Sequence, residues 1–160
     1  MNCLPFLIAF PRAKRRFCGS AAVLAAMFAG GCATVAPYDQ AAYEHATNVK
    51  VDTLALVSKA TGNYGDNLSE IKNVNLALQK AYEYDKDRSL NTSTRKEWED
   101  LLVEKNDDPK SGIIPRFLER WQRKGSLKPH AVADDRQNIS DAFDMIIQSE
   151  NGKNRSSQTK

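Results

Sequence analysis

The chain has 20 acidic residues but only two histidines, and no pair of carboxylates stands out as suited to acid–base chemistry. His45 and His130 are the only histidines, and Asp134 follows His130 by four residues. On a helix this spacing places two side chains on one face, where two ligands of a metal ion would lie, but two ligands do not complete a metal site. The sequence contains no HExxH, P-loop, GxSxG or dinucleotide-binding motif. We therefore expect no catalytic residue, no metal site and no cofactor.

The segment of residues 112–125 has the composition of a contact surface. Apolar and basic side chains would occupy different sides of a short helix there, a pattern that suits an anionic membrane surface, an acidic protein or a glycan. Alternatively, the apolar side packs on the rest of the protein and the arginines are solvated. We prefer this second interpretation, because a small helical protein needs its aromatic residues inside. The candidate contact residues are Arg116, Phe117, Arg120, Trp121, Arg123 and Lys124.

The first 31 residues have the order of a signal peptide. Four basic residues and no acidic ones occur in this segment, and the apolar run from Phe17 to Phe28 follows the basic cluster. The run is about a dozen residues long, whereas a helix needs about 20 to span a bilayer. The small residues Gly30 and Gly31 and then Cys32 come next. A removable leader is therefore favoured over a permanent transmembrane helix.

The stretch AGGC, residues 29–32, resembles the lipobox of bacterial lipoproteins. The resemblance implies cleavage between Gly31 and Cys32 and the attachment of diacylglycerol, followed by an acyl chain such as palmitate, to Cys32. It also implies a location in the cell envelope. Ala33 stands where an aspartate would favour inner-membrane retention, so the outer membrane facing the periplasm is expected. The alternative is an ordinary signal peptidase that cuts after Ala33 or Ala36.

Removal of the leader changes the charge and the thiol content of the chain. The leader carries four of the 23 basic residues and none of the 20 acidic ones, so the mature chain has a formal charge of −1. Cys3 and Cys18 would be lost, and Cys32 would carry lipid. No disulfide is then expected, although the compartment permits one. The near-neutral charge argues against a nucleic-acid partner.

Two long helices are predicted in the first half of the mature chain. Small and apolar residues recur at alternating steps of four and three over residues 39–60, which is the spacing of one helical face. Asp39 is suited to the N-cap position, and Gly62 ends the pattern. The second helix is predicted from residue 66 or 67 to about Arg88. The short turn between the two helices indicates an antiparallel hairpin.

Three more helices are predicted in the second half. Thr94 and Glu97 have the spacing of a capping box and introduce the first of them. A short helix follows over residues 115–124, with proline at its first turn and glycine after its end. The last long helix is expected over residues 129–149 and stops at the Asn-Gly pair 151–152. Residues 151–160 are polar, and we expect them to form a disordered tail.

These elements predict an all-α fold, a small antiparallel bundle of three long helices with two short helices covering one end or side. The expected organisation is a removed leader (1–31), the lipidated cysteine and linker (32–38), a helical domain (39–150) and the tail (151–160).

The combination of an anchor with no catalytic motif indicates a non-catalytic envelope lipoprotein that presents a helical surface to a periplasmic or membrane partner. One alternative is a carrier of a small ligand or lipid, with a cavity inside the bundle. The other is a cell-wall hydrolase using a carboxylate pair that the sequence does not single out.

Overall fold

Helices make up most of the described part of the chain. The computed structural model describes residues 35–105 and 111–158, with side chains described as far as Lys153. Its α-helices are α1 (Gln40–Ser58), α2 (Leu68–Lys86), α3 (Thr92–Leu102), α4 (Ile113–Lys124) and α5 (Pro129–Gln158), and two 3₁₀ turns, Lys59–Thr61 and Tyr64–Asn67, join α1 to α2. No strand occurs among the residues described. The predicted all-α class is confirmed.

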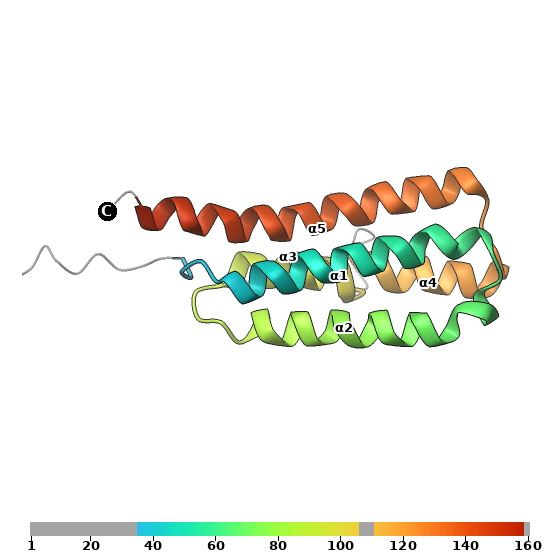
Figure 1. Cartoon of the computed structure of the whole chain (residues 1–160), viewed down its shortest axis with the longest axis horizontal. Helices are drawn as coiled ribbons and strands as arrows, with labels where there is room; N and C mark the ends of the chain where they lie inside the picture. Colours follow the sequence, from blue (N-terminus) through green and yellow to red (C-terminus); the bar gives the residue numbers. More distant parts are fainter. Residues whose placement is uncertain (1–34, 106–110, 159–160) are drawn as a thin grey trace, which may run out of the picture. The chain divides into compact units, whose positions relative to one another are not determined.

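The helices form an up-and-down bundle (Figure 1). α1 runs in one direction and α2 returns beside it, while α3 and α4 follow one another along a third line and α5 returns beside α1. The two short helices therefore share the length of the bundle and cover one of its sides. This arrangement has the pattern of a four-helix bundle whose third helix is interrupted between Leu102 and Ile113.

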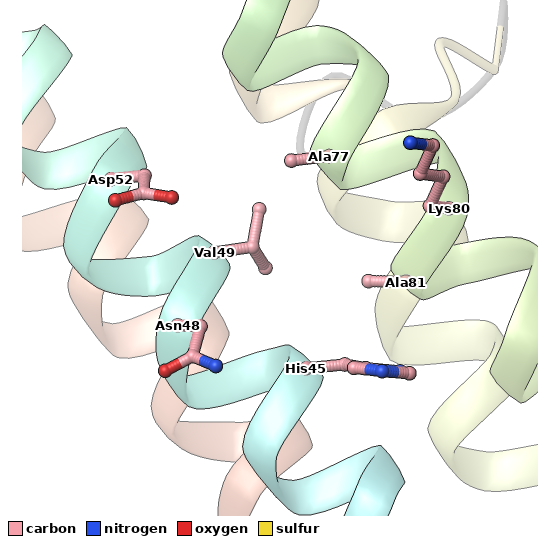
Figure 2. Close-up of a pocket in the computed structure, with 7 residues that line it drawn as sticks. All are labelled: His45, Asn48, Val49, Asp52, Ala77, Lys80 and Ala81. Atoms are coloured by element: carbon pink, nitrogen blue, oxygen red, sulfur yellow. The ribbon is translucent and has the colours of Figure 1, made fainter.

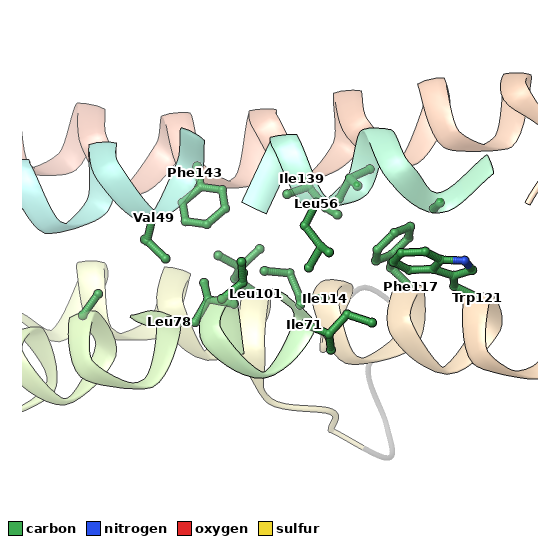
Figure 3. Packing of buried hydrophobic residues seen from close by; sticks show 14 of the residues in the cluster. Val49, Leu56, Ile71, Leu78, Leu101, Ile114, Phe117, Trp121, Ile139 and Phe143 are labelled. Atoms are coloured by element: carbon green, nitrogen blue, oxygen red, sulfur yellow. The ribbon is translucent and has the colours of Figure 1, made fainter. Parts of the chain in front are cut away.

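A continuous apolar core runs through the bundle (Figure 3). Trp98, Phe143 and Trp121 have no exposed surface, and the ring of Trp98 meets that of Phe143 edge to face at 6.0 Å between centroids. Each large apolar side chain buried in this way stabilises the fold by about 1.5–3 kcal/mol. Ala46 of α1 and Ala60 of the turn after it belong to the same core, where their small side chains let neighbouring elements approach closely.

Several helix ends lie where the sequence places them. The carboxylate of Asp39 accepts hydrogen bonds from the backbone N–H groups of Ala41 and Ala42, at 2.8 and 3.2 Å, and so caps α1. The turn after α1 ends at Gly62, and α4 ends at Gly125, which has a φ of +75°. Gly125 therefore ends α4 as predicted, whereas α1 itself ends at Ser58 and Gly62 follows the 3₁₀ turn after it.

The predicted end of the last helix is wrong. We expected it to stop at Ser149 before Asn151 and Gly152, but α5 continues to Gln158. The physical reason is Lys153, which is 5% exposed and binds side chains of other elements, so that the helix is held beyond the Asn-Gly pair. Residues 159–160 lie outside the described residues.

Two predicted helix starts are also wrong. α3 begins at Thr92, so Thr94 and Glu97 lie inside it, where their side chains accept hydrogen bonds from Lys153 and Ser149 of α5. α4 begins two residues before Pro115, because Gly112 adopts a left-handed conformation (φ +64°) that starts the helix early. A Cβ atom at Gly112 would lie 2.9 Å from the Cα atom of Glu104. Glycine therefore suits both the turn and the close approach.

Candidate functional site

The residues predicted from the sequence fall into two groups. Gly31 and Cys32, together with the predicted leader, lie outside the described residues. The segment of residues 112–125 forms α4, and its apolar side packs into the core, as the preferred interpretation expects. Phe117 and Trp121 are 2% and 0% exposed, and the indole N–H of Trp121 donates to the carbonyl oxygen of Gly62 at 3.0 Å. Neither aromatic ring therefore reaches the surface, where it could contact a membrane or a partner. Phe117 and Trp121 are core residues and not contact residues.

Of the basic residues of α4, Arg123 and Lys124 are exposed, whereas Arg116 and Arg120 are half-buried and line a hollow between α4 and α5. Arg120 forms an ion pair with Asp135, Arg116 lies 3.7 Å from a carboxylate oxygen of Glu104, and Arg123 lies 3.6 Å from Glu119. Lys124, at the end of the helix, is exposed. Neighbouring carboxylates thus face three of the four basic candidates, and α4 does not form a concentrated cationic surface.

A buried network of polar side chains lies at one end of the bundle, where the start of α1, the end of α2, the start of α3 and the last turns of α5 meet. We call it the ionic clamp. The clamp contains two acidic and two basic side chains, and all four are largely buried. Its members are Asp85, Arg88, Asn91, Glu150 and Lys153.

The clamp holds the chain that leads into α1. The guanidinium of Arg88 binds both oxygens of Glu150, at 2.8 and 3.1 Å, and donates to the carbonyl oxygen of Pro37 at 2.7 Å. The backbone N–H of Asp39 donates to Glu150 at 2.7 Å. The backbone N–H of Ala36 donates to the carbonyl oxygen of Leu90 at 3.1 Å. Residues 36–39 are therefore fixed to α2, α5 and the turn before α3.

The inner part of the clamp joins α2 and α3 to α5. Asp85 accepts hydrogen bonds from Arg88 and from the indole N–H of Trp98, each at 2.8 Å, and from the amide of Asn91 at 3.1 Å. The amide oxygen of Asn91 in turn accepts from the ammonium group of Lys153. That ammonium group also binds Glu150, so the acids and bases form one network.

Electrostatics in the clamp favour the charged forms. Burial alone would raise the pKa of Glu150, but hydrogen bonds from Arg88, Lys153 and the backbone of Asp39 hold it below its ordinary value. Burial lowers the pKa of Arg88, and its bonds to Glu150 and Asp85 more than reverse that effect, so the pKa is raised. In contrast, the pKa of Glu97 on α3 is raised, chiefly by burial. The carboxylate of Glu150 is therefore held ionised by its partners.

The geometry of the clamp suits a structural role, the joining of chain segments, better than a catalytic one. Both oxygens of Asp85 and of Glu150 accept hydrogen bonds from other members of the network or from Trp98 and Asp39. A general acid or base needs an atom directed at a substrate. Breaking a buried ion pair by removing one partner costs about 3–5 kcal/mol, which makes such a network a strong fastening of the segments it joins.

A shallow hollow lies between α1 and α2, and His45 is among the residues that line it (Figure 2). It has a volume of about 230 Å³, and Val49, Ala77 and Ala81 form its apolar part. His45 lies beside it, edge to face with Tyr84 at 4.9 Å. The polar groups come from successive turns of α1 and from one position of α2, and they do not gather around one point, as Figure 2 shows. The remaining lining residues are Asn48, Asp52 and Lys80.

Neither a metal centre nor a membrane-spanning helix is found in the described part of the chain. His130 and Asp134 are both exposed in the first turns of α5. Within residues 35–105 and 111–153, no three histidine, cysteine or acidic side chains are grouped so that they would hold a metal ion. None of the helices described has both the length and the apolarity that crossing a membrane requires.

Comparisons with protein-family models, with curated proteins and with solved structures found no match for this chain.

Sequence reasoning missed the clamp for an identifiable reason. Its members are spread from Asp85 to Lys153 and come together only when four elements meet. One signal was present, because Asp85 and Glu150 fall on the same faces of their helices as the apolar residues Leu78, Ala81 and Ile146. A charged residue within an apolar stripe would be buried, and since burying an unpaired charge is costly, it indicates a buried partner of opposite charge.

Proposed function

We propose that this chain is a non-catalytic lipoprotein of the bacterial envelope, held on a membrane by acyl chains on Cys32, whose helical bundle presents a surface to an envelope partner. The lipobox resemblance of residues 29–32 supports the anchor. Two or three acyl chains hold a protein on a membrane almost permanently, since each buried methylene contributes about 0.8 kcal/mol. The outer membrane, on its periplasmic side, is the proposed location.

The observation that carries this proposal is the fixation of residues 36–39 by the ionic clamp. Ala36 is 2% exposed and its backbone is bonded to Leu90, so the folded body begins within four residues of Cys32. A cut after Ala36 would remove this buried residue and its hydrogen bond. The structure of residues 36–39 thus argues against a cut after Ala36, one of the two positions at which an ordinary signal peptidase would cut.

The carrier alternative has no specific observation in its favour. Ala46 and Ala60 lie in the packed core. The hollows between the helices, including a larger one of about 580 Å³ beside Leu102, Val103 and Pro115, open to solvent. Two hollows are lined by a pair of acids, Asp135 with Asp141 and Asp52 with Glu70. Asp135 is paired with Arg120, Asp141 accepts a hydrogen bond from Gln137, and Glu70 is paired with Lys59, so the hydrolase alternative likewise gains no support.

Mass spectrometry of the full chain expressed in bacterial cells tests the anchor. The native protein is expected to start at Cys32, to carry diacylglycerol and an additional acyl chain, and to leave the membrane fraction only with detergent. Cys32→Ser is expected to lose the lipid, whereas Cys18→Ser, in the predicted leader, is the matched control and keeps it. An unmodified Cys32, or a mature chain that starts at Thr34 or Pro37, would contradict the proposal.

Photo-crosslinking in cells tests the partner. A crosslinker at the exposed position of Lys124 is expected to yield a defined adduct in the native protein that is lost in Cys32→Ser, because the partner is met only at the membrane. The same crosslinker at His130, which is exposed at the start of α5, tests whether the contact is confined to α4. Identical adducts in the native protein and Cys32→Ser would contradict a tethered-partner role.

A further inference from the structure

Two large apolar side chains are exposed beside the ionic clamp. Val35 is 52% exposed and Leu90 is 53% exposed, and the hydrogen bond from Ala36 to the carbonyl oxygen of Leu90 holds their two segments together. Leu90 also has a φ of +61° and is the only described residue other than glycine with a positive φ. Leucine is disfavoured in this conformation, in which glycine, asparagine and aspartate are the usual residues. The turn therefore keeps an exposed apolar side chain at a position that suits a polar one better.

The position of these residues is constrained by the chain that precedes them. Val35 follows Cys32 by three residues, and three residues of extended chain span at most about 11 Å. The start of α1 and the turn between α2 and α3 lie at the end of the bundle opposite the turn between α4 and α5 (Figure 1). Acyl chains on Cys32 would thus bring this end of the bundle, rather than α4, to the lipid surface.

We infer that Val35 and Leu90 form a lipid-contacting tip, with their side chains at the boundary between headgroups and acyl chains. This inference rests on the lipid anchor proposed above. Its partner is the apolar part of the bilayer rather than an anionic headgroup, because the exposed Asp87 lies in the same turn and the ammonium group of Lys86 binds Glu83 at 2.8 Å. The tip would hold the bundle in one orientation and direct α4 and the turn at Ser126 away from the membrane.

Fluorescence quenching in vesicles tests the tip. The mature lipidated protein has no other free thiol, so Ser89→Cys next to Leu90 takes a single environment-sensitive dye, and Ser126→Cys in the turn between α4 and α5 provides the matched position at the other end. Both proteins are reconstituted into phosphatidylcholine–phosphatidylglycerol vesicles whose acyl chains are brominated. A side chain at the headgroup–acyl boundary is within reach of the bromine atoms, so the dye at position 89 should lose about half of its emission and the dye at 126 less than about a tenth.

Substitution of the tip identifies the side chains responsible. Val35→Asn combined with Leu90→Asn should reduce quenching at position 89 at least about twofold, since both side chains lose their affinity for the acyl region. Asparagine suits the backbone of residue 90, so the fold should be retained, and a thermal unfolding curve checks this. Val51→Asn, at a 63% exposed position on the side of α1, is the matched control and should leave quenching unchanged.

The outcomes separate this inference from the anchor. If mass spectrometry shows acylated Cys32 but the dyes at positions 89 and 126 are quenched equally, the tip is overturned and the anchor stands. If the double variant is quenched as strongly as the native tip, Val35 and Leu90 are not the contact and the inference is again overturned. If Cys32 carries no lipid, both the anchor and the tip are overturned.

Discussion

At the residue scale, Leu90 is a position where the sequence does not suit the backbone. Replacing it with glycine should raise the free energy of unfolding by about 1 kcal/mol, because glycine adopts φ +61° without strain and the lost side chain is half exposed. Urea unfolding followed by circular dichroism measures the difference. The control is Leu76→Gly in α2, which is similarly exposed but helical, and this change should lower stability by about 1 kcal/mol. A loss of stability in both variants would contradict the argument.

The stability that the clamp provides should depend on pH because Glu150 must be ionised to bind Arg88 and Lys153. Glu150→Gln should lower the free energy of unfolding at pH 7 by about 3 kcal/mol, because Arg88 and Lys153 lose a buried charged partner. The pKa of Glu150 is lowered in the folded protein, so its contribution is present above its unfolded value of 4.5 and is lost as the pH falls through the folded value. The difference between the two proteins should therefore shrink below about pH 4.5.

Unfolding of both proteins in urea at a series of pH values tests this prediction. Glu83→Gln is the control, because Glu83 pairs with Lys86 at the surface and should contribute less than about 1 kcal/mol at any pH. A difference for Glu150→Gln that stayed constant down to pH 3 would show that the charge of Glu150 is not what holds the clamp.

At the scale of elements, the last turns of α5, which lie beyond the predicted helix end, join this helix to α2 and α3 through Glu150 and Lys153. Deleting residues 150–160 removes Glu150 and Lys153 and leaves Arg88 and Asp85 with fewer partners, so it should lower the free energy of unfolding by at least about 3 kcal/mol. Deleting residues 154–160 keeps both clamp residues and should cost less than about 1 kcal/mol. Thermal unfolding of the two truncated chains against the full chain measures this, and equal losses would contradict it.

The helices themselves could be predicted from the sequence because their signals are local. Asp39 reaches N–H groups two and three residues away, and Gly125 ends α4 through its own backbone, so the pattern around each of them is sufficient. Thr94 and Lys153 could not be placed in this way. These two residues lie 59 positions apart in the chain and bind each other only because α3 packs on α5. That packing makes the hydroxyl of Thr94 an acceptor for the buried ammonium group of Lys153 instead of a helix cap.

At the scale of the whole molecule, two tryptophans mark opposite ends of one core. Trp98 lies at the clamp and donates to Asp85, while Trp121 lies against Tyr64 at 5.3 Å near the other end. Every helix contributes to the apolar cluster between them (Figure 3). The interruption between α3 and α4 does not divide this core, because α1, α2 and α5 run past it on the other sides.

The bundle should consequently unfold as one cooperative unit. In Trp98→Phe, whose remaining fluorescence comes from Trp121, and in Trp121→Phe, which reports through Trp98, the fluorescence and far-ultraviolet circular dichroism transitions in urea should coincide within each variant. Both buried indoles should emit at short wavelength, and adding anionic vesicles should leave the emission of Trp121 unchanged, because that ring faces the core and not the surface of α4. If Trp121 instead loses its signal before the circular dichroism changes, α4 and the turn beside it unfold separately, and the core is held together mainly from the clamp end.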